Sequence, residues 1–153
     1  MLAESLEGTL LFEDFAHHPT SVKQTIEAFR ERFKERRIFV LFEPRSNTSR
    51  RSIFQKEYAQ ALSLADVVTI LEPDLSSLYS KDSNKVNALD LAALKEDIGQ
   101  ISGDSPVISS FLEVGHLLQW TKDTILNGDV LVIMSNGSFG NLARDLANYF
   151  KGK

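Results

Sequence analysis

The chain has 153 residues, of which 42% are apolar and 25% charged, and its formal net charge is −4. These values are typical of one soluble globular domain and argue against a nucleic-acid binder, which usually shows a basic face. Because cysteine is absent, disulfides and thiolate metal sites are excluded, and we expect a cytoplasmic protein. No apolar stretch approaches the ~20 residues of a membrane span. We do not expect the acidic N-terminal segment to act as a signal peptide.

Strand-like apolar runs alternate with helical patterns along the whole chain. We expect strands at residues 10–12, 38–42, 67–71, 107–108 and 130–134. Helices are expected at about 22–33, 51–64, 91–98, 111–125 and 139–150. This alternation predicts a single α/β domain over residues 1–153, with a doubly wound, mostly parallel, Rossmann-like sheet and helices on both faces. The strand order stays open.

Several residues predict where the helices begin and end. Ser21 with Gln24, and Ser110 with Glu113, have the capping-box pattern of a helix start. Asp90 is expected to cap the third helix and Gly99 to stop it. The polar stretch 72–88 is long for a loop within a compact domain, and such loops are usually functional or disordered.

A first polar run, Asp14 to Ser21, follows the first predicted strand. In open α/β sheets, ligands bind outside the carboxyl ends of the strands, so this run is a candidate for binding. Asp14 could accept hydrogen bonds from ribose hydroxyls, and His17 or His18 could contact phosphate or act in acid–base chemistry. An ordinary turn containing Asp and Pro is the alternative. A metal site is not expected, because adjacent histidines point in divergent directions.

A second polar run, Phe42 to Arg51, gathers three arginines in an otherwise acidic chain. Positive side chains at a helix start oppose the helix dipole, so an anion such as a phosphate or a carboxylate-rich peptide would be favoured there. The alternative is a solvated basic patch with Thr48 or Ser49 as an ordinary N-cap.

A third run, Ser135 to Gly140, follows the clearest strand. Only Gly137 and Gly140 match the end of a dinucleotide-binding GxGxxG motif, so a turn facing some other ligand, or a plain glycine turn, is favoured. No GxxxxGK[ST] motif occurs, and the chain cannot cradle ATP phosphates in the P-loop manner.

These three runs, in this order, resemble the C-terminal domain of the Mur ligases. The D-x-A-H-x-P pattern at residues 14–19 opens that domain in the family, and the run at 42–51 is similar to one member. That member joins L-alanyl-γ-D-glutamyl-meso-diaminopimelate to UDP-N-acetylmuramic acid in cell-wall peptide recycling. The resemblance implies one domain of a three-domain enzyme. ATP and Mg²⁺ would be bound mainly by a central domain, so this chain would be inactive alone.

The resemblance also assigns roles by position. It implies nucleotide-binding roles for Asp14, His17 and His18, with His17 as the candidate for catalysis. It implies a peptide-binding set of Arg45, Ser46, Thr48, Arg50, Ser135, Asn136 and Phe139. The expected partners are the peptide, UDP-N-acetylmuramic acid and the other two domains, with no nucleic acid, membrane or metal bound by this domain.

Two other readings stay open. The chain could be the C-terminal domain of the family's alanine-adding member, although Arg45-Ser46 replaces the His-Arg-Tyr run of that member. It could also be a free-standing flavodoxin-like binding or signalling module, with Asp14 as a phosphoacceptor. The DNPR signature of another diaminopimelate-using member is absent, so other residues would recognise diaminopimelate here.

Overall fold

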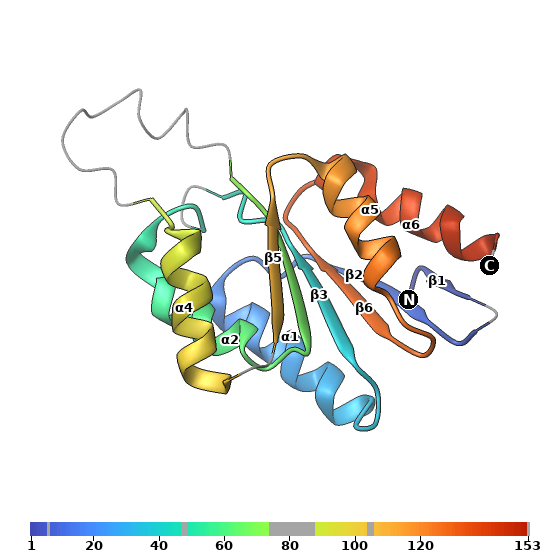
Figure 1. Cartoon of the computed structure of the whole chain (residues 1–153), viewed down its shortest axis with the longest axis horizontal. Coiled ribbons are helices and arrows are strands. Elements are labelled where there is room, and N and C mark those ends of the chain that lie inside the picture. Colours follow the sequence, from blue (N-terminus) through green and yellow to red (C-terminus); the bar gives the residue numbers. More distant parts are fainter. Residues whose placement is uncertain (6, 47–48, 74–87, 104–105, 153) are drawn as a thin grey trace.

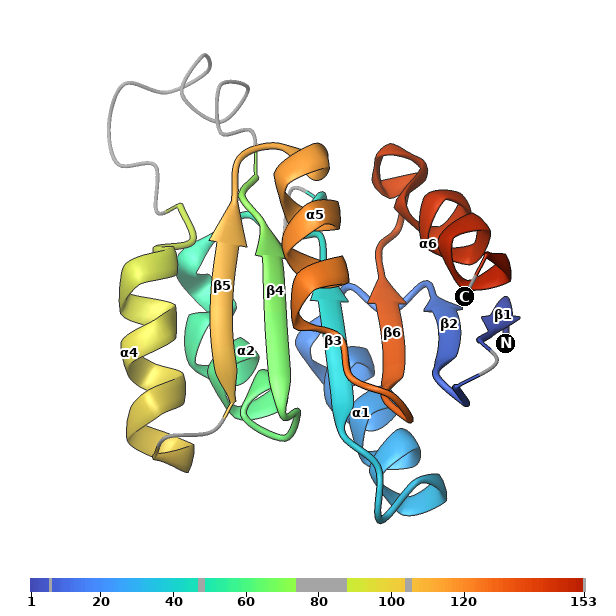
Figure 2. The ribbon, with the colours of Figure 1, turned by 45° about the vertical axis from the view of Figure 1, so that its right-hand side comes forward.

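The sheet is mostly parallel, as predicted. The computed structural model describes residues 1–5, 7–46, 49–73, 88–103 and 106–152. Its six strands have the order β1-β2-β6-β3-β4-β5 (Figures 1 and 2). They are β1 (Ala3–Glu4), β2 (Leu10–Asp14), β3 (Ile38–Phe42), β4 (Val67–Leu71), β5 (Val107–Phe111) and β6 (Val130–Met134). Only β1 pairs antiparallel with its neighbour. The last strand in the chain, β6, therefore lies between β2 and β3.

Helices cover both faces of the sheet, which confirms the predicted α/β class. On one face lie α1 (Pro19–Arg32), α2 (Gln55–Leu62) and α4 (Leu91–Ser102). On the other lie α5 (Val114–Thr124) and α6 (Leu142–Lys151), drawn in front of the sheet in Figure 2. Short 3₁₀ helices, η1 (Ser52–Phe54) and η2 (Phe139–Asn141), precede α2 and α6.

The two central strands explain the continuous apolar runs in the sequence. All five residues of β3 and all five of β6 are buried. In β3, Val40 and Phe42 pack on the side of α1 and α2, whereas Phe39 and Leu41 pack on the side of α5 and α6. A parallel strand covered on both faces has no polar alternation, and this strand is such a case.

Some predicted boundaries were wrong. The edge strand β1 was missed, because a two-residue strand leaves no periodicity to detect. Ser21 does not cap α1: the N-cap is His18, whose Nδ1 accepts from Thr20 N at 3.4 Å. Ser110 lies inside β5, and α5 begins only at Val114. A capping-box pattern cannot tell a helix start from the end of a strand.

The third helix begins as predicted but ends later. Asp90 Oδ1 accepts from Ala93 N at 3.0 Å, which confirms the N-cap. The helix passes through Gly99 to Ser102 and ends at Gly103, whose φ of 69° is in the left-handed region. Most of the stretch 72–88, whose role was left open, lies outside the described residues.

Two arginines form hydrogen bonds that link the amino ends of β2, β3 and β6. Asp129 is only 2% exposed, and its carboxylate accepts from Arg37 Nε at 2.9 Å and from an Arg37 terminal nitrogen at 2.7 Å. Asp129 also accepts from Leu126 N at 2.9 Å. The hydrogen bond to Asp129 raises the pKa of Arg37. Neighbouring Arg36 donates to the carbonyls of Gly8 and Gly128, so the starts of β2, β3 and β6 are held together.

We expect Asp129→Asn to lower the free energy of unfolding by about 2–3 kcal/mol, because it leaves the Arg37 guanidinium without its charged acceptor. Urea denaturation of the two proteins measures the difference. The matched control is Glu27→Gln in the exposed Lys23–Glu27 pair, which should change stability by no more than about 0.5 kcal/mol. Equal effects of the two substitutions would contradict a structural role for the Arg37–Asp129 pair.

Candidate functional site at the carboxyl ends of the strands

The sheet brings the three polar runs of the sequence to one edge. In the register of β2, β6 and β3, Asp14 pairs with Met134, and Met134 pairs with Phe42. The ladder continues one step further, because Ser135 N donates to Asp14 O at 3.2 Å and Glu43 N donates to Met134 O at 3.0 Å. The three turns that follow these strands are therefore direct neighbours at the upper edge of the sheet in Figure 2.

The turn after β2 uses much of its polar chemistry for its own structure. Asp14 Oδ1 accepts from Ala16 N at 2.7 Å and from Thr25 Oγ1 at 3.5 Å. His18 serves as the N-cap of α1, and His17 Nδ1 lies 3.0 Å from Phe15 O. These hydrogen bonds are those of an ordinary turn, which is the alternative interpretation of this run. Asp14 and His17 are each half-buried.

The turn after β3 is built around two serines. Ser49 N donates to Ser46 Oγ at 3.0 Å, and the two hydroxyls lie 2.9 Å apart, with Ser49 fully buried. Ser49 is not an N-cap, because Arg51 occupies that position before η1. Arg45 is exposed and Arg50 half-buried, and Thr48 lies outside the described residues.

The turn after β6 connects to the turn after β3. The Ser135 hydroxyl donates to Glu43 Oε2 and accepts from Gly137 N at 3.0 Å. A Cβ atom on Gly137 would lie 2.1 Å from a terminal nitrogen of Arg45, so only glycine leaves room for that guanidinium. The sequence analysis did not include Glu43 among the candidate site residues. The one feature of the sequence that could have indicated it is its position directly after a fully apolar strand.

The remaining residues of the third run differ in their access to a ligand. Phe139 is 1% exposed and packs in the core beside Leu142, so its side chain does not face the turns. Only its backbone, at a φ of 44°, could contribute to a pocket. Asn136 Oδ1 is buried and finds no hydrogen-bond partner among the described residues.

Tyr58 links the turn after β2 to the turn after β3. Its side chain is fully buried, and its hydroxyl donates to His17 O at 2.5 Å. The same hydroxyl is hydrogen-bonded to the Ser49 side chain. Burial raises the pKa of Tyr58 above its ordinary value of 10.0.

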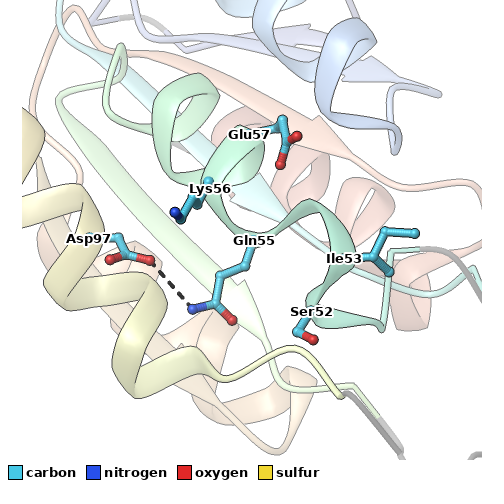
Figure 3. A pocket seen from close by; sticks show the side chains of 6 residues that line it. All are labelled: Ser52, Ile53, Gln55, Lys56, Glu57 and Asp97. Atoms are coloured by element: carbon cyan, nitrogen blue, oxygen red, sulfur yellow. Dashed lines mark hydrogen bonds between the residues drawn. The ribbon is translucent and has the colours of Figure 1, made fainter.

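Two hollows lie near these turns. One, of about 450 Å³, lies at the ends of β3, β4 and β5 and is lined by Glu43, Pro44, Arg45, Arg50, Leu71, Glu72, Pro73 and Leu112. The other, of about 350 Å³, lies between α2 and α4 and is lined by Ser52, Ile53, Gln55, Lys56, Glu57 and Asp97 (Figure 3).

The second hollow lies where η1 and the start of α2 approach α4. Gln55 points toward Asp97, with Nε2 at 3.4 Å from the carboxylate (Figure 3). Its Oε1 accepts from Asp90 N at 3.2 Å. Gln55 thereby ties α2 to the start of α4. The first hollow, by contrast, contains two of the residues predicted to bind peptide, Arg45 and Arg50.

Within the part of the chain that the structure describes, no three His, Cys, Asp or Glu side chains are placed to hold a metal ion. In the same residues, no helix has the length and apolar character needed to cross a membrane.

Comparison with known proteins assigns the family. The model of the "Mur ligase, glutamate ligase domain" family matches residues 1–137. The chain belongs to this family. UDP-N-acetylmuramate–L-alanine ligase of Sulfurihydrogenibium sp. (strain YO3AOP1) is 31% identical to this Mur ligase domain over 144 residues, which are 94% of this chain and 30% of that protein. The chain thus spans about 30% of the length of the curated relatives it matches.

Solved structures agree with the Mur ligase fold. The murein peptide ligase of Psychrobacter arcticus 273-4 is 26% identical with a TM-score of 0.74, covering 99% of this chain and 30% of that one. The UDP-N-acetylmuramate-alanine ligase of Thermotoga maritima is 17% identical with a TM-score of 0.69, covering 99% of this chain and 29% of that one. The second likeness shows the fold alone.

We expect Tyr58→Phe to destabilise the domain by about 1–2 kcal/mol, because His17 O loses a buried donor. The effect should also depend on pH. In the wild type the unfolded state loses the tyrosine proton near pH 10.0, whereas the folded state retains it to a higher pH. Stability therefore falls as pH rises above that value, by up to about 1.4 kcal/mol per pH unit. Urea unfolding at about pH 9 and about pH 11 should show a smaller fall for Tyr58→Phe.

Gly137→Ala should displace the Arg45 guanidinium while leaving the fold intact, because the clash is with the end of a flexible side chain. We expect a change in unfolding free energy of no more than about 0.5 kcal/mol. The Arg45 side-chain NMR signals should nevertheless shift. Gly140→Ala is the contrast: it places a Cβ 2.9 Å from Val114 at a φ of 56°, and should cost more than about 1 kcal/mol. Unchanged Arg45 signals in Gly137→Ala would show that this close approach is absent in solution.

Proposed function

We propose that this chain is the peptide-binding and ATP-closing domain of a murein peptide ligase, which joins L-alanyl-γ-D-glutamyl-meso-diaminopimelate to UDP-N-acetylmuramic acid. The observation that carries the proposal is the seating of Arg45 against Gly137, beside the Glu43–Ser135 pair and the hollow that Arg50 lines. A peptide with several carboxylates needs such a basic, donor-rich edge. The likeness to the Psychrobacter arcticus enzyme supports the same assignment.

In the proposed reaction, this chain holds the peptide while another domain binds most of the ATP. In this proposal, ATP converts the muramyl carboxylate into an acyl phosphate, and the free amine of the peptide attacks the acyl carbon and displaces phosphate. The peptide side of this chain, around Arg45, Ser46, Arg50 and Ser135, would hold the peptide so that its amine reaches that carbon. Thr48, Asn136 and the backbone at Phe139 belong to the same predicted set. Orientation of this kind lowers the entropy cost of a two-substrate reaction.

The nucleotide side would be the turn after β2. Asp14 retains one carboxylate oxygen for ribose hydroxyls, and His17 and His18 lie beside it at the start of α1. The described residues bring no three His, Cys, Asp or Glu side chains together to hold a metal ion, and the sequence has no P-loop. In the proposed enzyme, Mg²⁺ and the ATP phosphates are held mainly by another domain.

A second candidate is the C-terminal domain of the alanine-adding ligase, which the name of the Sulfurihydrogenibium relative favours. Free L-alanine has one carboxylate, and a site for it has no need of a hollow with two guanidiniums. A titration followed by amide chemical shifts separates the two candidates. We expect the tripeptide, and not L-alanine or Mg-ATP alone, to shift the signals of residues 45–51 and 135–140. The reverse pattern would favour the alanine-adding enzyme.

Arg45→Ala should weaken tripeptide binding by about 10- to 100-fold in the same titration, because one charge-assisted hydrogen bond is worth about 1.5–3 kcal/mol. Its unfolding free energy should change by less than about 0.5 kcal/mol, because Arg45 is exposed. The matched control is Arg144→Ala, an exposed arginine on α6. A large loss of stability with unchanged peptide binding would make Arg45 a structural residue instead.

A further inference from the structure

The sheet ends at β5, and the outer edge of this strand has no backbone partner among the described residues. On its inner edge β5 pairs with β4, and Val107 N donates to Asp66 O at 3.0 Å. Because the direction of the backbone groups alternates along a strand, the N–H and C=O groups of Ile108 and Ser110 point away from β4. An open edge of this kind can accept one more strand.

The edge of β5 lacks the features that usually prevent such pairing. Proteins block an open edge with a charged residue, a proline or a bulge. The strand Val107–Phe111 contains no charge and no proline, and it pairs with β4 residue for residue without a bulge. Lys95 of α4 lies nearby, but its Nζ donates to the Ser110 hydroxyl at 3.0 Å, and that hydroxyl donates to Glu72. The lysine charge is therefore engaged by side chains and does not block the backbone edge.

The sequence of β5 is complementary to itself. In antiparallel pairing about a two-fold axis at Ser109, Ile108 lies opposite Ser110 of a second copy. These are the residues whose backbone groups point outward, so each such pair can exchange both of its hydrogen bonds. Val107, which is 53% exposed, lies opposite Phe111 of the second copy on the same face of the sheet. A β-branched residue opposite an aromatic one stabilises an antiparallel pair, and no like charges meet.

We propose that the outer edge of β5 is a self-association surface, on which a second copy of this chain pairs antiparallel through Val107–Phe111. The pairing joins the two sheets into one continuous sheet. The three turns of the candidate site follow β2, β6 and β3, none of which is at this edge, so association leaves them accessible in both copies. The inference is therefore independent of the proposed function. One short strand buries less area than a stable dimer needs, so we expect a weak dimer in exchange with the monomer.

Sedimentation velocity at concentrations from about 10 μM to about 1 mM should give a sedimentation coefficient that rises with concentration. Hydrogen exchange followed by NMR over the same range locates the contact. The amide protons of Ile108 and Ser110 should exchange at least about two-fold more slowly at the highest concentration, because the dimer protects them. Those of Val107 and Ser109, which face β4, should be unchanged and serve as the internal control.

Charge at Ser109 tests the position of the two-fold axis. Ser109→Lys and Ser109→Asp should each weaken self-association about ten-fold or more, because each places like charges opposite one another. An equimolar mixture of the two variants should restore it, because opposite charges then meet. The matched control is Leu126→Lys, which adds the same charge at an apolar residue that is 58% exposed and lies away from β5. This variant should associate as the wild type does.

Urea unfolding of each variant separates loss of association from loss of folding. Val107→Lys, at an exposed position, should weaken association about three-fold or more and covers the case in which a charge at Ser109 unfolds the chain. A wild-type chain that stays monomeric at about 1 mM would overturn the proposal. So would folded Ser109 and Val107 variants that associate as strongly as the wild type. Association without slower exchange at Ile108 and Ser110 would place the contact elsewhere and would also overturn it.

Discussion

The parallel pairing of β6 with β2 on one side and β3 on the other is the constraint on which the site depends. Its register sets Asp14, Met134 and Phe42 side by side, so the turns that follow meet at one edge. Both β3 and β6 are buried on both faces, which ties the register to the packing of the core. A one-residue slip would turn every side chain of a strand to the opposite face and would part Glu43 from Ser135. The packing of the core therefore also sets the geometry of the candidate site.

Many of the polar atoms at this edge hold the turns together. Asp14, His18, Ser46 and Ser135 each hold a backbone N–H of their own turn. These bonds fix the backbone before any ligand arrives, which lowers the entropy cost of binding. The groups left facing outward, Arg45 above all, are those that need a partner. This division explains how one short edge can be both well ordered and charged.

The sequence was a good guide to the elements and a poor guide to their neighbours. Long apolar runs such as 38–42 and 130–134 predicted buried strands, because burial on both faces leaves a strong local signal. The place of β6 between β2 and β3 depends on contacts between distant segments, so no local pattern contains it. Glu43 was missed for the same reason, because its hydrogen bond to Ser135 joins two strands that lie far apart in the sequence. Phe139 was placed in the pocket by resemblance, whereas its side chain lies in the core.

Tyr58 shows how the two sides of the site are related. Its hydroxyl bonds to the turn that holds His17 and to the turn that holds Ser49, and the ring is fully buried beneath them. Such a link could carry a signal between the proposed nucleotide and peptide sides only if the linked elements had two arrangements. Tyr58 packs against Phe42 in a core that also includes residues of α1 and α2. The tyrosine therefore acts by holding the two turns at a fixed separation.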